Sequence, residues 1–175
     1  METAVKVPLG ERVNLRMLVF IAVIGFLVGY PIYILIDAQM SGGVKNAANG
    51  YKLVDLKAMS TFEFDQTNGT ITDIPKKWRE LDGQKVIMRG EMWDSRGAGP
   101  NVETFELCYS IAKCCFSGPP LVQHFIHATP VRNAQLAYYS GQVEVKGILH
   151  VKVEHDAGKV SRIYSVEAQS VDPVQ

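Results

Sequence analysis

The longest apolar segment of the chain runs from residue 17 to residue 36 without one charged side chain. At ~1.5 Å per residue, a helix of this length matches the ~30 Å hydrocarbon core of a bilayer. A cleaved signal peptide has only ~7–15 apolar residues, and no clear small-x-small cleavage site follows this segment. A helix in a soluble core would show a polar stripe, which is missing here. The pattern therefore predicts a transmembrane helix over residues 17–36 that acts as an uncleaved signal anchor.

The charges beside this segment predict its orientation. Lys6, Arg12 and Arg16 precede it, whereas the first charge after it is Asp37. Because cations are enriched on the cytoplasmic side of membrane proteins, we expect residues 1–16 to stay in the cytoplasm. This predicts a single-pass protein of the inner (cytoplasmic) membrane whose C-terminal domain is periplasmic or extracellular. The membrane is thus its first predicted partner, through the N-terminal helix.

The remaining chain is predicted to contain a linker and one domain. Residues 37–50 are mostly small and polar, which is typical of a linker. Residues 51–175 suffice for one domain with its own core, and we expect this domain to lie outside the cytoplasm.

Within the domain, apolar and polar residues mostly alternate, as they do along strands with one buried face. The segments that we predict as strands are 84–93, 103–111, 121–129, 142–154 and 162–171. Residues 73–83 instead indicate a short helix, with Pro75 in its first turn and Gly83 as its stop. Residues 53–64 fit either a strand or a short helix.

Two glycines inside these strands indicate where the sheet bends. Gly90 and Gly147 interrupt the alternation, and glycine within a strand is typical of a bulge or a tight bend. The order of strands, turns and glycines resembles the OB-fold, a five-stranded Greek-key barrel. The predicted fold class is therefore mainly β: a small five-stranded OB-like barrel with one short helix, preceded by a single N-terminal transmembrane helix.

Charge and motifs narrow the possible functions. The chain has 18 basic and 18 acidic residues, and residues 1–43 hold three of each, so the domain is neutral. A neutral domain lacks the basic groove that nucleic acids require, so no nucleic-acid partner is expected. Motifs of hydrolases, metalloproteases, phosphate loops and dinucleotide binding are also missing from the sequence. We therefore expect a non-catalytic domain.

Three cysteines, Cys108, Cys114 and Cys115, lie within eight residues of one another. In an oxidising compartment, this proximity favours a disulfide from Cys108 to Cys114 or to Cys115. Alternation places Cys108 beside Glu106, opposite the face of Leu107, which indicates that Cys108 is not a simple core residue. A redox-active thiol and inert packing remain as alternatives.

A metal site is a further interpretation of this region. Cys114, Cys115, His124 and His127 offer ligands that suit zinc or copper, although their spacing matches no standard zinc motif. His124 and His127 are three residues apart, so on a continuous strand they point to opposite faces. Both reach one ion only if the strand begins after His124 or bulges there. Otherwise no cofactor is expected.

Other residues near the cysteines are expected to have structural roles. Trp78 and Trp93 are expected to pack in the core or in loops, and Pro119-Pro120 is expected to form a rigid turn.

A set of residues between positions 74 and 123 carries a family resemblance. These residues are Ile74-Pro75, Leu81-Asp82-Gly83, Val86, Tyr109, Cys114-Cys115, Pro119-Pro120 and Gln123. Their arrangement resembles an uncharacterised bacterial family of membrane-anchored proteins or lipoproteins with an OB-like barrel, over residues 74–172. This resemblance implies an extracytoplasmic location and no established activity. Many members carry Cys-x-His before the prolines, whereas Phe116 and Ser117 stand here without a histidine.

Two functions are compatible with these features. The first is a membrane-tethered extracytoplasmic binding or accessory module of unknown ligand, non-catalytic, with a partner protein in the cell envelope. The alternative is a carrier of a metal or metallocofactor that uses the Cys108/Cys114/Cys115 cluster. Periplasmic haem chaperones also join one N-terminal anchor to an OB barrel, but no haem-attaching histidine motif follows the last predicted strand here.

Overall fold

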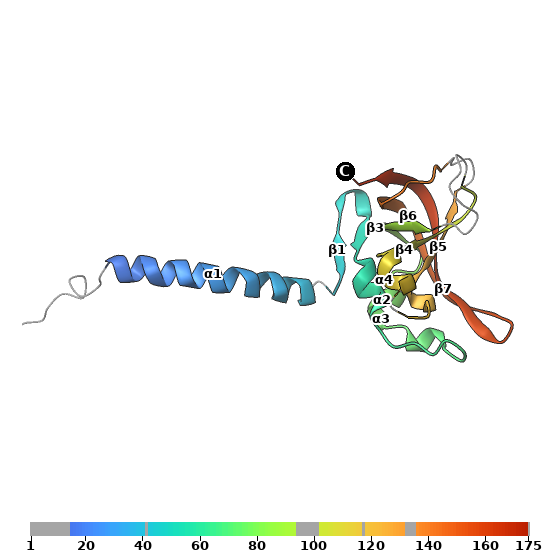
Figure 1. Cartoon of the computed structure of the whole chain (residues 1–175), viewed down its shortest axis with the longest axis horizontal. Coiled ribbons are helices and arrows are strands. Elements are labelled where there is room, and N and C mark those ends of the chain that lie inside the picture. Colours follow the sequence, from blue (N-terminus) through green and yellow to red (C-terminus); the bar gives the residue numbers. More distant parts are fainter. Residues whose placement is uncertain (1–14, 41, 94–101, 117, 132–135, 175) are drawn as a thin grey trace, which may run out of the picture. The chain divides into compact units, whose positions relative to one another are not determined.

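The computed structural model describes residues 15–40, 42–93, 102–116, 118–131 and 136–174 (Figure 1). The chain forms two compact units, Met1–Ser41 and Gly42–Gln175. The first unit contains α1 (Leu15–Met40), which extends beyond both ends of the apolar segment. By length and composition, α1 is apolar enough to cross a membrane, and its described side chains from Arg16 to Tyr33 are exposed.

The second unit is mainly β (Figure 1). Its strands are β1 (Val44–Asn46), β2 (Lys52–Val54), β3 (Gln84–Trp93), β4 (Phe105–Cys108), β5 (Ile126–Pro130), β6 (Gln142–Asp156) and β7 (Lys159–Pro173). They form one seven-stranded sheet in the order β1-β2-β3-β4-β5-β7-β6. Because β6 also pairs with β3, five of these strands close into a ring. β5 runs parallel to β7 and β2 parallel to β3, whereas the other pairs are antiparallel.

Short helices fill the connections. They are η2 (Ala48–Gly50), α2 (Leu56–Ser60), η3 (Ile71–Asp73), α3 (Lys76–Arg79), α4 (Ile111–Phe116) and η4 (Val122–His124). The predicted helix over 73–83 corresponds to α3, with Pro75 at its N-cap and Gly83 turning the chain at a φ of 70°. The ambiguous segment 53–64 contains the end of a strand and a helix. Asp55 separates them, because its carboxylate accepts hydrogen bonds from the first amides of α2.

The predicted linker is partly folded. β1 and η2 lie within residues 37–50, and the second unit begins at Gly42. Gly42 and Gly43 have φ values of 59° and 85°, which favour glycine. A Cβ on Gly43 would lie within 3.0 Å of Ala58 and in very tight contact with Trp78, so the chain enters this unit already packed against α2 and α3.

The long strands confirm the predicted alternation. On β3, the almost fully buried residues are Val86, Met88 and Met92. On β6, they are Val143, Val145 and Leu149. The described core is completed chiefly by Trp78, Leu107, Ile163, Tyr164 and Val166. Burial of this apolar face is the main stabilising contribution to the ring.

The two strand glycines serve close approaches between backbones. A Cβ on Gly90 or on Gly147 would lie less than 3.0 Å from the carbonyl oxygen of Cys108 or of Glu167, respectively. The register shifts between Lys146 and Gly147, which is the irregularity predicted there. Gly90 instead stays in register with Val143 and carries no bulge.

Two predicted strands are shorter than expected. The segment 103–111 becomes β4 followed by α4, because the Glu91 carboxylate accepts the hydrogen bond of the Ile111 amide at 2.7 Å. The segment 121–129 becomes η4 followed by β5, because the Val122 amide donates to the Gln66 side chain at 3.0 Å. In both places, a distant side chain ends the strand.

Candidate functional site

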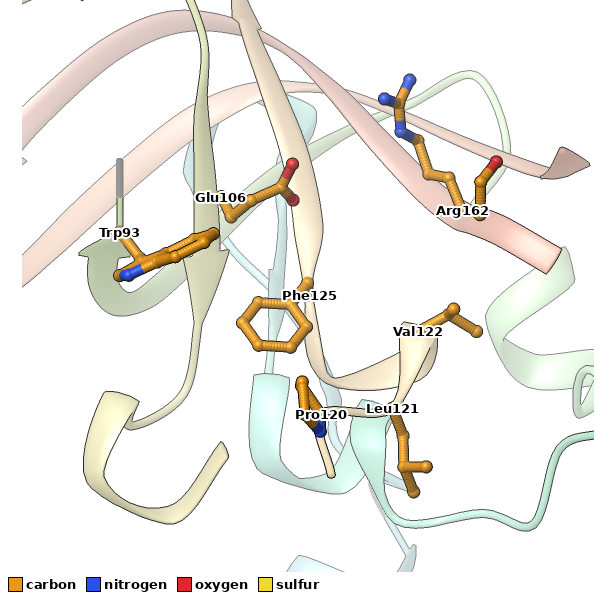
Figure 2. Close-up of a pocket in the computed structure, with 8 residues that line it drawn as sticks. Trp93, Glu106, Pro120, Leu121, Val122, Phe125 and Arg162 are labelled. Atoms are coloured by element: carbon orange, nitrogen blue, oxygen red, sulfur yellow. The ribbon is translucent and has the colours of Figure 1, made fainter. Parts of the chain in front are cut away.

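A groove of about 350 Å³ lies where the ends of β3 and β4 approach the start of β7 (Figure 2). Its lining residues are Trp93, Glu106, Pro120, Leu121, Val122, Phe125, Ser161 and Arg162. They come from four separate parts of the chain, so the groove exists only in the folded protein. Its volume falls within the range of small-ligand and side-chain pockets, ~300–1,000 Å³.

The groove is mainly apolar. Trp93 is 42% exposed, and its ring lies 6.4 Å from the ring of Phe125 at an angle of 51°. Pro120, Leu121 and Val122 lie beside Phe125 (Figure 2). Trp93 is therefore not a core residue, although its ring contacts Phe125 in a loop. Trp78 is 1% exposed, which confirms the prediction that it packs in the core. An exposed tryptophan in a concave apolar surface is typical of a binding site.

Two side chains of opposite charge lie at the edge of the groove, on opposite sides in Figure 2. The Glu106 carboxylate is 2.7 Å from Nδ1 of His127, and the Arg162 guanidinium donates to Glu154 at 3.3 Å. Each charge is therefore oriented by a neighbour. The edge offers an acceptor at Glu106 and donors at Arg162, which can orient a ligand on the apolar floor.

The sheet register explains the position of Glu106. Trp93 of β3 is paired with Glu106 of β4, which is paired with His127 of β5, which is paired with Ser165 of β7. Alternation places this row on the face opposite the buried Leu107. The row thus brings an aromatic ring, a carboxylate and an imidazole together across neighbouring strands.

A hydrogen-bond network fixes the wall formed by residues 120–125. The side chain of Gln66 accepts from the Val122 amide and donates to the side chain of Gln123, both at 3.0 Å. Gln123 in turn donates to the Phe62 carbonyl at 3.1 Å, and the Val160 amide donates to the Gln66 carbonyl at 2.9 Å. This network ties three segments together and holds the groove in shape before any ligand binds.

The sequence analysis missed Gln66 and Gln123. Gln123 is 4% exposed, and a buried amide side chain needs partners. Its partners are 57 and 61 residues away along the chain, so no local pattern indicates them. The resemblance contained Gln123 but gave it no role.

The cysteines differ from expectation. Cys108 is fully buried rather than outward-facing, because β4 ends there and its backbone packs against Gly90 while its thiol donates to the Glu91 carbonyl at 3.7 Å. Cys114 of α4 is also buried, and burial together with the two nearby thiols raises the pKa of Tyr109. No disulfide joins Cys108 to Cys114 within the described residues. The side chain of Cys115 lies outside them, so a disulfide to Cys115 stays a prediction.

The metal interpretation meets one of its conditions. β5 begins after His124, as a shared ion would require. However, Nδ1 of His127 faces Glu106, whereas Nδ1 of His124 is buried without a hydrogen-bond partner in the described part of the chain. Burial lowers the pKa of His124. No three metal-binding side chains gather among the described residues, and with Cys115 outside them the zinc or copper site stays a prediction.

Solved structures provide the similarity found by comparison with known proteins. No family model matches the chain, and no curated protein matches it. A solved structure of a DUF3299 family protein from Pseudomonas aeruginosa PAO1, from a family of domains of unknown function, is similar with a TM-score of 0.44 and 17% identity. The similarity covers 69% of this chain and 79% of that chain.

Proposed function

We propose that the chain is a membrane-tethered, non-catalytic binding module. α1 crosses the inner membrane with its N-terminus in the cytoplasm, and the second unit lies in the periplasm or outside the cell. The length and apolar composition of α1 support this proposal, as do the cations that precede it.

The second unit is, on this proposal, an OB-like barrel. The ring β3-β4-β5-β7-β6, closed by the β3–β6 pairing, supports it. The parallel pairing of β5 with β7 is compatible with Greek-key connections. OB barrels bind ligands on the face of their second and third strands, which here are β4 and β5. Glu106 of β4 and Phe125, which directly precedes β5, line the groove.

The observation that carries the proposal is the exposed ring of Trp93 in a groove with a fixed wall. Tryptophan and arginine dominate the binding energy of protein interfaces when they lie around a preformed pocket. The groove has room for one or two apolar side chains, and Glu106 and Arg162 present opposite charges beside it. We therefore propose as its ligand a segment of an envelope protein that inserts an apolar side chain between a basic and an acidic residue.

Site-specific photocrosslinking in native membranes tests this function. A photoreactive phenylalanine analogue replaces half-buried Phe125 in the full chain, and the control replaces Val174, which is exposed and directly follows β7. We expect one discrete adduct from position 125, abolished by Trp93→Ala and absent from position 174. Identical adducts from both positions, or an adduct that survives Trp93→Ala, would contradict the groove as the binding site.

Topology requires a separate measurement. An alkaline phosphatase fused to the C-terminus is expected to be active, since this reporter folds only outside the cytoplasm, and the chain is expected to resist alkaline carbonate extraction. An inactive fusion would contradict the orientation, and extraction would contradict the tether.

A further inference from the structure

The apolar part of the groove is built around two aromatic rings that leave ring surface open. The rings of Trp93 and Phe125 are 6.4 Å apart and tilted by 51°, so they are not stacked on each other. Pro120 lies beside Phe125 (Figure 2), and Trp93 is 42% exposed. The faces of aromatic rings carry partial negative charge and attract the C–H groups of a ligand. The groove can therefore hold a compact apolar ring against these faces.

The polar groups of the lining favour a ligand with free carbonyl groups. Nε1 of Trp93 and the guanidinium of Arg162 can only donate hydrogen bonds, whereas the Glu106 carboxylate accepts them. A polyproline II segment has no internal hydrogen bonds, so its carbonyl groups remain free. Each proline in it also removes a backbone N–H that would need an acceptor. Such a segment matches the donors of the groove.

A ligand strand finds no edge of the sheet at the groove. Strand addition requires an exposed edge with several unpaired backbone groups. Glu106 of β4 is paired on both sides, with Trp93 and with His127. On β7, the Val160 amide, one residue before the lining begins, already donates to the Gln66 carbonyl at 2.9 Å. The described strands around the groove therefore provide no continuous edge for an added strand.

A ligand helix is too long for the groove. Helices that bind in grooves use apolar side chains at positions i, i+3, i+4 and i+7, which extend over about 10 Å at ~1.5 Å per residue. The groove of about 350 Å³ has room for one or two apolar side chains. Of the common modes of peptide recognition, polyproline II binding to aromatic rings is the one that this size and lining fit.

The charged residues of the lining favour a basic residue in the ligand. The Arg162 guanidinium already donates to the Glu154 carboxylate at 3.3 Å, so an acidic ligand residue would compete with Glu154. His127 contacts only Oε1 of Glu106, at 2.7 Å. A carboxylate can accept several hydrogen bonds, so Oε2 can accept one from a ligand cation. Glu106 is thus the better placed of the two charges to select a ligand.

We infer that the groove binds a proline-containing segment in the polyproline II conformation, with a basic residue beside the proline that pairs with Glu106. The proline ring lies against Trp93 and Phe125, and the ligand carbonyl groups accept from the donors of the lining. Because a polyproline II segment is extended before it binds, little conformational entropy is lost. The inference rests on the proposed binding function of the groove and names the chemical class of its ligand.

Tryptophan fluorescence of the full chain in detergent tests this ligand class. The chain has two tryptophans, and Trp78 is 1% exposed, so acrylamide quenches chiefly Trp93. Three tryptophan-free peptides of equal length are titrated: an arginine followed by prolines, a glutamate followed by prolines, and an arginine followed by alternating alanines and serines. We expect the first peptide to protect Trp93 with a dissociation constant about ten-fold lower than the other two, as one charge-assisted hydrogen bond or one ring contact would give.

A matched pair of variants tests the role of Glu106. Glu106→Gln keeps a polar group beside His127 but removes the charge, and we expect it to bind the two proline peptides equally. Glu167→Gln, at an exposed position of β7 outside the lining, should keep the preference for arginine. An unchanged preference in Glu106→Gln would overturn the pairing with Glu106.

Other outcomes separate this inference from the proposed function. Equal protection of Trp93 by the alanine–serine peptide overturns the preference for polyproline II, while the groove remains a binding site. If no peptide protects Trp93, the inference is overturned. Photocrosslinking from position 125 then decides the proposed function separately, because it does not depend on the class of ligand.

Discussion

The two sides of the ring are built differently. On one side β6 and β7 are 15 residues each and pair along most of their length, and β3 pairs with β6 over its first eight residues. On the other side β4 and β5 pair over only three residues, next to the groove. There, hydrogen bonds accepted by the side chains of Gln66 and Glu91 and donated by that of Gln123 replace the longer ladders. The long side is specified by local alternation, and the groove side by contacts between distant residues.

The largest expected effect is on the long side. Gly147→Ala would place a methyl group against the Glu167 carbonyl, which cannot move without breaking the β6–β7 ladder. We expect the free energy of unfolding to fall by about 3 kcal/mol, at the upper end of the usual cost of overpacking. Urea unfolding of the full chain in detergent, followed by circular dichroism, measures this. Lys152→Ala, exposed on the same strand, is the control and should change stability by less than ~0.5 kcal/mol.

The groove side should depend on its amide network. Gln123→Ala leaves the Phe62 carbonyl and the Gln66 amide without their partner, and we expect a loss of about 2 kcal/mol in the free energy of unfolding. Crosslinking from position 125 should also weaken, because the wall moves. Gln169→Ala removes an exposed bond to Tyr51 and is the matched control. Equal effects of the two variants would show that the network does not hold the wall.

The buried hydroxyl of Tyr164 on β7 should slightly destabilise the long side of the ring. The hydroxyl of Tyr164 is buried without a hydrogen-bond partner among the described residues, and burial raises its pKa, so it stays neutral. Tyr164→Phe removes this unpaired group, and we expect a gain of about 1 kcal/mol. Tyr51→Phe, which loses a bond to Gln169, should give no gain. A loss of stability in Tyr164→Phe would indicate a partner for the hydroxyl, such as a buried water.

The smallest expected effect is a loss of stability at acid pH that depends on His124. Burial lowers the pKa of His124 from the ordinary 6.5, so the folded protein prefers the neutral ring. As pH falls through 6.5, the unfolded chain binds a proton that the folded protein resists, and stability decreases; above that pH the group contributes nothing. We expect His124→Gln to lose less stability than the parent between pH 7.5 and 5.5. His155→Gln, at an exposed position, should behave as the parent does.

Sequence reasoning succeeded where structure is locally specified. Alternation identified β3, β6 and β7, because one face of each is buried along most of its length. It missed β1 and β2, since three residues are too short to show a period. It also extended the strand of residues 103–111 past its end, because the carboxylate that begins α4 belongs to Glu91 on another strand.

The groove could not be predicted in the same way. Alternation places Trp93 on the outward face of β3 with Arg89, but nothing local indicates that its ring lies beside Phe125 in a groove. Phe125 and Arg162 meet it only through the pairing of β4, β5 and β7. Alternation alone also fails at Cys108, which it places outside, whereas the close approach of Gly90 buries it.

The first strand has a consequence for crowding. β1 terminates the sheet, has three residues and carries the exposed Lys45. Proteins confined to a surface meet one another often, and an open strand edge invites sheets of neighbouring copies to join end to end. A short edge with a charged side chain offers few hydrogen bonds to a second sheet and repels an identical edge. Many copies can therefore be present at high concentration without polymerising through this strand.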